Sequence, residues 1–310
     1  MQLTVDNFIM PFFVVEGKNI KSPIKNFPGV FHLSIDKMLK DIEEIKKLGI
    51  PAVLLFGVTN KKDDIGSYAW DKNGVVQNAV KKIKQKYSDI VVITDVCLCG
   101  YKSDGHCGIM RIKNKKLKIK NYGIDIETTL KYLSKIALSH AEAGCDFVAP
   151  SAMMDGQVKS IRNILNKNGF DNVGIFAYSA KFASNFYGPF REALESSPKF
   201  GDRKSYQLDY ANTSVALRKI KQDIDDGADI VMVKPALCYL DIIKAAKQKF
   251  NVPIAAYNVS GEYSMVKLAA KEGIISEKES VLEILTAIKR AGADLIITYH
   301  AKEVAKWLKK

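Results

Sequence analysis

Apolar positions along the chain follow two alternating periods. Met38, Ile42 and Ile45 recur at the three-to-four-residue spacing of an amphipathic helix, and a short apolar run at 52–56 follows them. The same order, a helix and then a short apolar run, recurs along the rest of the chain, with a further helix expected at about 127–143. Because strands that alternate with helices pair in parallel, this pattern predicts an α/β fold.

Seven apolar runs are clear strand candidates, and a weaker eighth lies at 204–208. The seven are 52–56, 90–94, 146–149, 173–178, 229–233, 253–257 and 294–299. Eight βα units close into a (β/α)8 TIM barrel, which we expect for residues 36–310, with residues 1–35 as a short N-terminal lead-in segment outside the barrel. A doubly wound open sheet is the alternative, but no Gly-x-Gly-x-x-Gly follows the first strand.

A Gly-small-Asp-apolar junction occurs three times, at 144–147, 227–230 and 292–295. The glycine can take the left-handed conformation that ends a helix, and the apolar residues that follow it enter the sheet. The copies are irregularly spaced, so they indicate a repeated βα unit and not a solenoid repeat.

Lys234 follows the apolar run 229–233 and precedes Pro235, which cannot donate to a strand ladder. An ammonium there is partly desolvated, which lowers its pKa, and a neutral amine forms Schiff bases with carbonyls. A single lysine at a strand end more often extends to solvent. Lys181, however, follows the run 173–178, and barrel active sites lie at the carboxyl ends of the strands. Two neighbouring ammonium groups disfavour each other's charge, so the pair indicates carbonyl chemistry.

Polar side chains also stand at the ends of the strand runs, including the run that leads to Lys181. They are Asp95, Ser151, Tyr178, Tyr257 with Ser260, and Tyr299 with His300. Arg191 and Arg203 lie on the loop after Lys181. An arginine binds a carboxylate through two parallel hydrogen bonds. One arginine alone would indicate a surface ion pair, but two beyond a strand-end lysine indicate a carboxylate-bearing substrate.

Three of the five cysteines, Cys97, Cys99 and Cys107, fall within eleven positions beyond the second strand run. Structural zinc sites usually have four ligands, whereas three thiolates with one open position indicate a catalytic metal site. His106 is adjacent to Cys107, and neighbouring residues rarely both reach one tetrahedral ion. Three unligated thiols in a loop are the alternative, and they would be an oxidation liability.

Composition changes this interpretation little. Of 310 residues, 47% are hydrophobic and 26% are charged, as in an ordinary globular protein. No basic segment precedes the apolar run 8–15, which is too short to span a bilayer, so we expect a cytoplasmic protein with no membrane partner. The net charge of +13 would suit nucleic acid, but the one dense lysine cluster, at 113–120, has no interleaved aromatics. We interpret it as a solvated loop and expect no nucleic-acid partner.

Several motifs run in order through the chain from about Pro11 to the C-terminus. They are DVCLC (95–99), GHCG (105–108), APS (149–151), YSAKFAS (178–184), FYGPFR (186–191), GDRKSYQ (201–207), MVKP (232–235) and VSGEY (259–263). In this order they resemble the porphobilinogen synthase (5-aminolevulinate dehydratase) family. The resemblance implies a (β/α)8-barrel lyase that joins two molecules of 5-aminolevulinate and releases two waters. The product would be porphobilinogen, for tetrapyrrole and haem synthesis.

The resemblance also implies roles for the strand-end residues. Lys234 would form a Schiff base with the substrate that becomes the propionate side, and Lys181 would bind the ketone of the second substrate. Cys97, Cys99 and Cys107 match the zinc-using branch, which implies one catalytic zinc ion. The implied substrate-binding residues are Arg191, Arg203 and Gln207 at the second carboxylate, Ser260 and Tyr299 at the first, and Asp95, Ser151, Tyr178 and Tyr257 around them.

Two departures from the family pattern bear on regulation and assembly. Lys219 stands where some members have a glutamate that serves an allosteric magnesium, which puts magnesium activation there in doubt. The segment before Pro11 is short beside the family's usual N-terminal arm, so a homo-oligomer is expected but the usual octamer is in doubt. The alternative functions are a class I aldolase-type lyase, with one catalytic lysine and no zinc, and a basic nucleic-acid-binding protein.

Overall fold

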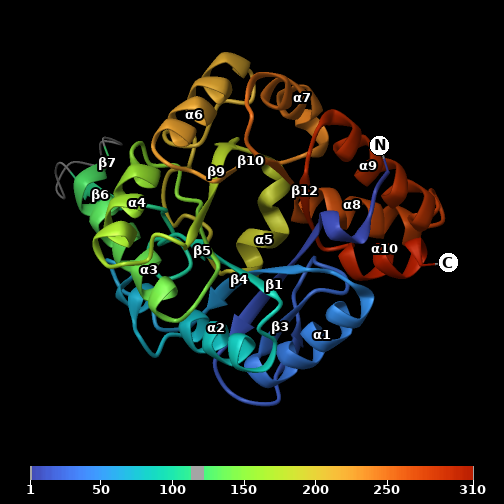
Figure 1. The fold of residues 1–310 in the computed structure, drawn as a ribbon, viewed down its shortest axis with the longest axis horizontal. Coiled ribbons are helices and arrows are strands. Elements are labelled where there is room, and N and C mark those ends of the chain that lie inside the picture. Colours follow the sequence, from blue (N-terminus) through green and yellow to red (C-terminus); the bar gives the residue numbers. More distant parts are fainter. Residues whose placement is uncertain (1, 113–121, 310) are drawn as a thin grey trace.

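The computed structural model describes residues 2–112 and 122–309, so the lysine cluster at 113–120 lies outside the described residues. At its centre, eight parallel strands form a closed barrel (Figure 1). In barrel order they are β1 (Phe8–Val15), β4 (Ala52–Val58), β5 (Val91–Val96), β8 (Phe147–Pro150), β9 (Gly174–Lys181), β10 (Ile230–Lys234), β11 (Ile254–Asn258) and β12 (Leu295–Thr298). Pairing of β12 with β1 closes the ring. The predicted TIM barrel is therefore confirmed.

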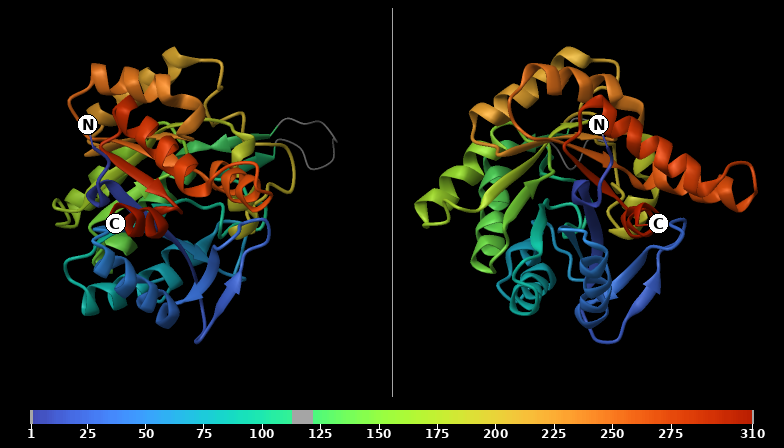
Figure 2. Two further views of the ribbon diagram at one scale, coloured as in Figure 1. Left: turned by 90° about the vertical axis from the view of Figure 1, so that its right-hand side faces the viewer. Right: turned by 45° about the vertical axis from the view of Figure 1, so that its right-hand side comes forward.

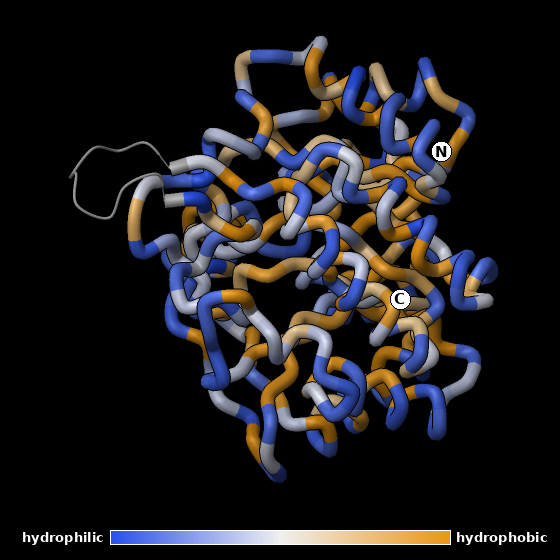
Figure 3. The backbone as a smooth tube through the Cα atoms, turned by 90° about the vertical axis from the view of Figure 1, so that its left-hand side faces the viewer, coloured by the Kyte–Doolittle hydropathy of each residue, from blue (hydrophilic) through white to orange (hydrophobic). Residues whose placement is uncertain are grey.

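Helices cover the outside of the barrel (Figure 2), and hydrophobic stretches run through the centre while hydrophilic ones gather at the rim (Figure 3). The outer helices are α1 (Ile35–Leu48), α2 (Val75–Lys86), α3 (Ile126–Glu142), α4 (Gln157–Lys167), α6 (Thr213–Asp225), α7 (Leu240–Lys249), α8 (Ser260–Lys271), α9 (Glu277–Ala291) and α10 (Ala301–Leu308). The short helix α5 (Gly188–Ala193) instead lies across the middle of the barrel in Figure 1. Among the described residues, no helix is both long and apolar enough to cross a bilayer.

Smaller elements complete the described chain. Strand β3 (Phe31–Ser34) pairs with the end of β1 and, on its other side, with β2 (Lys21–Pro23). A hairpin of β6 (Ile109–Ile112) and β7 (Tyr122–Asp125) packs beside α3. The 3-10 helices are η1 (Val5–Asn7), η2 (Ser67–Trp70), η3 (Asn185–Tyr187) and η4 (Leu237–Tyr239).

The recurring Gly-small-Asp junction has a structural reason. Gly144 and Gly227 follow α3 and α6 with φ angles of 98° and 100°, a conformation that glycine takes without a Cβ clash. The aspartate two residues later accepts a hydrogen bond from a main-chain N–H at the start of the preceding barrel strand. The three bonds run from Val92 N to Asp146 Oδ2 (2.7 Å), from Ile175 N to Asp229 Oδ2 (2.7 Å) and from Ile254 N to Asp294 Oδ2 (2.8 Å). The junction therefore anchors strand starts at the amino end of the barrel.

The strand prediction is wrong at one place. Residues 204–208 form turns, and within them Leu208 makes an isolated bridge to Phe182. The eighth barrel strand is β1, which pairs with β4 and β12. The prediction that residues before about Asp36 lie outside the barrel is therefore wrong for this strand. A near-continuous apolar run is typical of a parallel strand that is buried on both faces; 8–15 is such a run, whereas 204–208 is mostly polar.

We expect Phe8→Ala to lower the free energy of unfolding by about 3–5 kcal/mol, because Phe8 is fully buried and the substitution leaves a cavity. Ile274→Ala, at a residue that is 74% exposed beyond the end of α8, should change it by less than about 0.5 kcal/mol. Urea unfolding followed by circular dichroism measures both variants. Equal unfolding midpoints would contradict the place of β1 in the barrel core.

Candidate active site

Two lysines end neighbouring strands at the carboxyl rim of the barrel. Lys181 ends β9 and Lys234 ends β10, and the two residues are Cα partners in the parallel ladder. Both residues are buried, at 6% and 2% exposure. Their Nζ atoms lie 5.6 Å and 5.1 Å from the ring centroid of Tyr178. The strand register therefore brings the two predicted nucleophiles to one place.

Aromatic rings surround Lys234. Its Nζ lies 4.1 Å from the ring centroid of Tyr257, 4.6 Å from that of Phe190 and 5.3 Å from that of Tyr187. Burial lowers the pKa of Lys234 well below its usual value, and the charge of Lys181 lowers it further. Cation–π contacts favour the charged form, but each is worth only about 0.5–2 kcal/mol, and desolvating an ammonium costs several kcal/mol. Lys234 is therefore held toward the neutral amine, which attacks carbonyls.

Lys181 is held by the end of β8. Its Nζ donates a 2.7 Å hydrogen bond to the main-chain oxygen of Ser151. Burial raises the pKa of Asp95, on β5, to about 6. A hydrogen bond from Ser151 and the charges of Lys181 and Lys234 act in the opposite direction and lower it. Asp95 Oδ1 is buried without a hydrogen-bond partner in the described part of the chain. These contacts place Asp95, Ser151 and Lys181 in one polar wall.

The three cysteines of the predicted metal site lie together. Cys97, Cys99 and Cys107 are buried, and their Sγ atoms lie within 4.8 Å of one another. The Sγ atoms of Cys97 and Cys99 are 3.3 Å apart. Hydrogen bonds from the Cys97 and Cys99 thiols lower the pKa of Cys107 well below its usual value. A thiolate is the form that binds metal, and three converging sulfurs fit a tetrahedral ion that keeps one position for another ligand.

The ring of His106 faces away from these sulfurs. Its Nδ1 is 3.2 Å from the hydroxyl oxygen of Tyr206, and its Nε2 is 3.0 Å from the main-chain oxygen of Phe200. The Tyr206 hydroxyl also accepts a 3.4 Å hydrogen bond from Cys107 N. This arrangement agrees with the expectation that His106 and Cys107 do not both reach one ion, and it ties the cysteine loop to the loop that carries Arg203.

The loop with the two arginines packs on the cysteine loop. Arg203 Nη2 donates to the main-chain oxygens of Gly105, at 2.8 Å, and Ser196. The Nε atoms of Arg191 and Arg203, and both amide atoms of Gln207, are buried without a hydrogen-bond partner among the described residues. Buried polar atoms usually have partners. The unpaired donors therefore indicate a ligand with acceptor atoms, such as a carboxylate.

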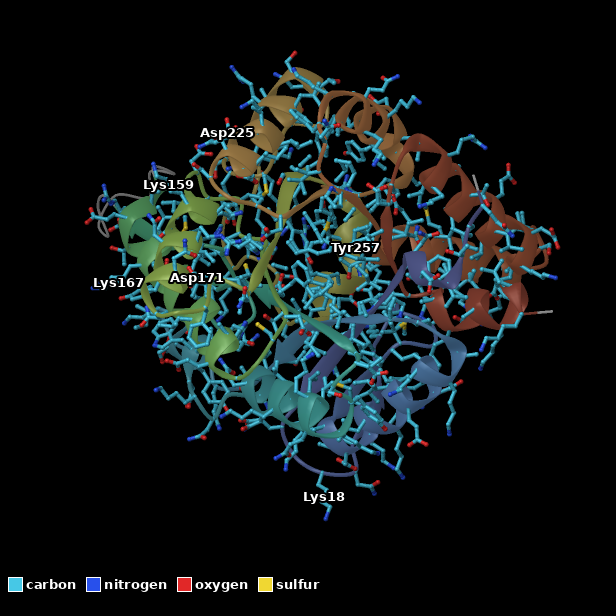
Figure 4. The ribbon with its side chains drawn as sticks, viewed as in Figure 1. Lys18, Lys159, Lys167, Asp171, Asp225 and Tyr257 are labelled. Atoms are coloured by element: carbon cyan, nitrogen blue, oxygen red, sulfur yellow. The ribbon has the colours of Figure 1, made fainter. Side chains whose placement is uncertain are left out.

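The first predicted carboxylate site is built by β11, α8 and β12. The hydroxyl oxygens of Tyr257 and Tyr299 are 2.8 Å apart, and Figure 4 shows Tyr257 near the middle of the molecule. Ser260 Oγ accepts a 3.1 Å hydrogen bond from Phe190 N and donates a 3.2 Å bond to Phe186 O. These contacts join the strand ends to α5 and its lead-in.

Two cavities help to locate the site within the described part of the chain. A cavity of about 10 Å³ borders Asp95 and Cys97. A larger cavity, of about 860 Å³, lies beside β7, α6 and the turn at Gln207. Neither of the two strand-end lysines lines either of these two cavities, but Asp95 and Cys97 line the smaller one, so the smaller cavity is the one that borders the candidate site.

The chain matches one protein family over nearly its whole length. A sequence model of delta-aminolevulinic acid dehydratase matches residues 1–307. The chain belongs to this family. The delta-aminolevulinic acid dehydratase of Methanothermus sociabilis is 56% identical over 304 residues, which cover 98% of this chain and 92% of the relative. That of Bacillus subtilis is 50% identical over 307 residues, covering 99% and 92%.

A solved structure of the same family has the same fold. It is delta-aminolevulinic acid dehydratase (porphobilinogen synthase) from Toxoplasma gondii, in complex with the reaction product porphobilinogen. The two structures superpose with a TM-score of 0.93 at 40% sequence identity, over 99% of this chain and 86% of that one.

Two further residues of this dehydratase-family site are absent from the residues predicted by sequence. Tyr187 and Phe190 complete the aromatic wall around Lys234. Both lie in the FYGPFR motif, which points to its arginine as the functional residue. An aromatic side chain in an irregular loop has no periodicity that would mark its direction. The available sequence signal was the run of three aromatics, Phe186, Tyr187 and Phe190, directly before Arg191.

We expect Lys234→Met to stabilise the folded chain at neutral pH. The folded-state pKa of Lys234 is lowered below an unfolded value of about 10.4, so the unfolded chain binds the extra proton and stability rises with pH between the two values. Methionine has no charge to bury, so its advantage should be largest at neutral pH and shrink towards pH 10. Urea unfolding at several pH values measures this, with the exposed Lys244→Met as control. A variant less stable than the parent at pH 7 would contradict the argument.

Proposed function

We propose that the chain condenses two molecules of 5-aminolevulinate into porphobilinogen and two waters, with Lys234 and Lys181 forming the Schiff bases. The observation that carries this proposal is the pair of buried lysines that are register partners on adjacent strands. Membership of the delta-aminolevulinic acid dehydratase family supports the overall reaction and makes the chain a lyase. The Toxoplasma gondii relative binds porphobilinogen, which supports the same product here.

The two lysines activate the two ketones. The neutral amine of Lys234 adds to the ketone of one substrate, and loss of water leaves an imine. Lys181 holds the second ketone in the same way. An imine accepts electrons, so a carbon next to one imine can lose a proton and bond to the other imine carbon. The lysine on the carbon that was attacked then leaves as its free amine, with loss of a proton from a neighbouring carbon. The amino group of the substrate that was attacked adds to the remaining imine carbon, displaces the other lysine and closes the ring, and a final proton loss gives the pyrrole. The two waters are those lost when the two imines form.

The remaining polar groups orient the substrates. Arg191, Arg203 and Gln207 offer the unpaired donors that would bind the second carboxylate. Ser260 and Tyr299 would bind the first carboxylate with their hydroxyls, and Tyr257 fixes the Tyr299 hydroxyl through their 2.8 Å contact. Both ends of each substrate are then fixed, which brings the reacting carbons together.

The aromatic wall keeps water from the imines. Phe190 lies over Lys234 and packs on the barrel, with its ring centroid 4.9 Å from that of Phe56 and 5.7 Å from that of Phe13. Because water hydrolyses an imine, a closed α5 preserves the intermediate until the ring forms.

We propose zinc as the metal that Cys97, Cys99 and Cys107 hold, because thiolates with one open position suit this ion. When bound, zinc supplies a Lewis acid that favours an unprotonated amino group. Lys102 keeps the loop folded: its Nζ donates to Gly108 O at 2.7 Å and lies 3.0 Å from Asp104 Oδ2. The chain therefore preforms the sulfur cluster.

Two finer expectations remain proposals. Lys219 is buried, with its Nζ 2.8 Å from Asp223 Oδ1 and 3.7 Å from Asp155 Oδ1. An ammonium that already neutralises these carboxylates supports the doubt about magnesium activation at that helix. Self-association remains a prediction, and the exposed apolar side chains of Met265 and Leu268 on α8 support it.

Borohydride added with 5-aminolevulinate should fix substrate on Lys234 and Lys181, because it reduces an imine to a stable amine. Mass spectrometry of the digested chain locates the adducts. Lys234→Gln and Lys181→Gln should each abolish porphobilinogen formation, whereas the exposed Lys244→Gln should not. Adduct on neither lysine would reject the mechanism. Activity that survives in one of the two variants would favour an aldolase-type reaction.

Serine at position 97, 99 or 107 should lower the zinc affinity at least about 100-fold, since losing even an outer hydrogen-bond partner of a ligand costs 10–100-fold. Cys238→Ser, at an exposed thiol, is the control. Competition with a chromogenic chelator measures the affinity, and protons should be released on binding as thiols become thiolates. If Cys97→Ser, Cys99→Ser and Cys107→Ser all bind zinc as the parent does, this site is not the zinc site.

A further inference from the structure

A buried chain of hydrogen bonds ties together the carboxyl ends of β10, β11 and β12. Glu262, in the first turn of α8, points back to these strand ends. Its Oε1 accepts a 2.8 Å bond from Leu237 N, three residues after Lys234. Its Oε2 accepts a 2.8 Å bond from Val259 N and a 3.2 Å bond from Asn258 Nδ2. One carboxylate therefore joins the loop after β10 to the end of β11.

The series of hydrogen bonds continues from β11 to β12. Asn258 and Thr298 are Cα partners at the ends of these strands. Thr298 Oγ1 donates a 3.0 Å bond to Asn258 Oδ1 and accepts a 3.2 Å bond from His300 N. Glu262, Asn258 and Thr298 are all at most 1% exposed. A buried polar group that loses its partner costs about 1–3 kcal/mol. This series of hydrogen bonds therefore opposes any shift of one strand end against the next.

The residues proposed to bind the ketone and the carboxylate of the first substrate lie at these same strand ends. Lys234, on β10, would hold the ketone, whereas Ser260 after β11 and Tyr299 after β12 would hold the carboxylate. The span from the amine to these hydroxyls decides how many carbons can separate a ketone from a carboxylate. In 5-aminolevulinate, two methylene groups separate them.

We infer that Glu262, Asn258 and Thr298 are positioning residues that set the chain length of the keto acid accepted at Lys234. The inference rests on the proposed function, since it takes Lys234 as the ketone-binding amine. The three residues act through the strand ends and do not touch the reacting atoms. A fixed span discriminates against one extra methylene by about 10–200-fold, and a span that can move loses part of that discrimination.

The experiment compares two keto acids that lack the amino group. In 4-oxopentanoate two methylenes separate ketone and carboxylate, as in the substrate, and in 5-oxohexanoate there are three. Each acid is reduced onto Lys234 with borohydride over a range of concentrations, and mapping of the modified lysine gives the half-saturating concentration. The parent should prefer 4-oxopentanoate at least about tenfold.

Variants of Thr298 and Glu262 then test the role of the buried hydrogen bonds. Thr298→Val keeps the shape but removes the hydroxyl, and Glu262→Gln removes one acceptor oxygen; each should lower the preference several-fold. Thr298→Ser keeps the hydroxyl and should restore it. Thr59→Val is the matched control, because Thr59 Oγ1 accepts a 3.0 Å bond from Lys61 N just past β4, as Thr298 does from His300 N. It should leave the preference at the parent value.

The outcomes separate the inference from the function beneath it. A general loss of folding weakens both keto acids alike and leaves their ratio unchanged. Trapping on Lys234 with an unchanged ratio in Thr298→Val and Glu262→Gln overturns the inference and leaves the proposed function intact. Absence of trapping on Lys234 in the parent overturns the proposed function, and the inference with it. If Glu262→Gln does not fold, the Thr298→Val and Thr298→Ser pair decides alone.

Discussion

The burial of two lysines side by side is the constraint on which the site depends. Desolvating an ammonium costs several kcal/mol even after the surroundings relax, and a second positive charge nearby adds to that cost. The fold imposes the pairing regardless, because the β9–β10 ladder fixes Lys181 opposite Lys234 through main-chain contacts that no side-chain charge can reverse. This cost lowers the pKa of Lys234 and so holds its side chain toward the neutral amine, which is the reactive form. Reactivity is thus a consequence of where the backbone puts the side chain.

This constraint connects α5 to the chemistry. Phe190 and Tyr187 are part of the surroundings that desolvate Lys234 and lower its pKa. Phe190 belongs to α5, which crosses the middle of the barrel in Figure 1. If α5 moved away, water would reach the amine, the charged form would become cheaper, and any imine would meet a hydrolysing solvent. The same two side chains therefore both shield the amine from water and lower its pKa. Because Phe190 packs on Phe13 and Phe56, α5 is anchored directly on the barrel core.

The parts of the site that sequence could predict are those fixed by strand ends. An apolar run that ends in lysine and proline marks Lys234, and the cysteine spacing marks the sulfur cluster. Strand β1 was not predicted as a barrel strand, because β2 and β3 lie between it and the next helix. It therefore does not form part of a recognisable strand–helix repeat. Glu262 was not predicted as a site residue for a different reason. A glutamate in the first turn of a helix is normally an exposed capping residue. Its hydrogen bond to Leu237 N, 25 residues away, cannot be read from the local sequence.

Carboxylates accept main-chain N–H groups at both ends of the barrel, but under opposite conditions. The three junction aspartates at the amino end remain partly exposed, and each also pairs with a helix cation. The pairs are Lys84 with Asp146, Arg162 with Asp229 and Lys247 with Asp294. These aspartates lose little hydration on folding, so their hydrogen bonds to the strand starts cost little free energy. Glu262 is buried, and burial raises the pKa of its carboxyl to about 7, although hydrogen bonds from Val259, Leu237, Asn258 and Ala236 lower it. A group so costly to bury is explained by what it holds in place, because its contacts end at the strands that carry the ketone and carboxylate sites.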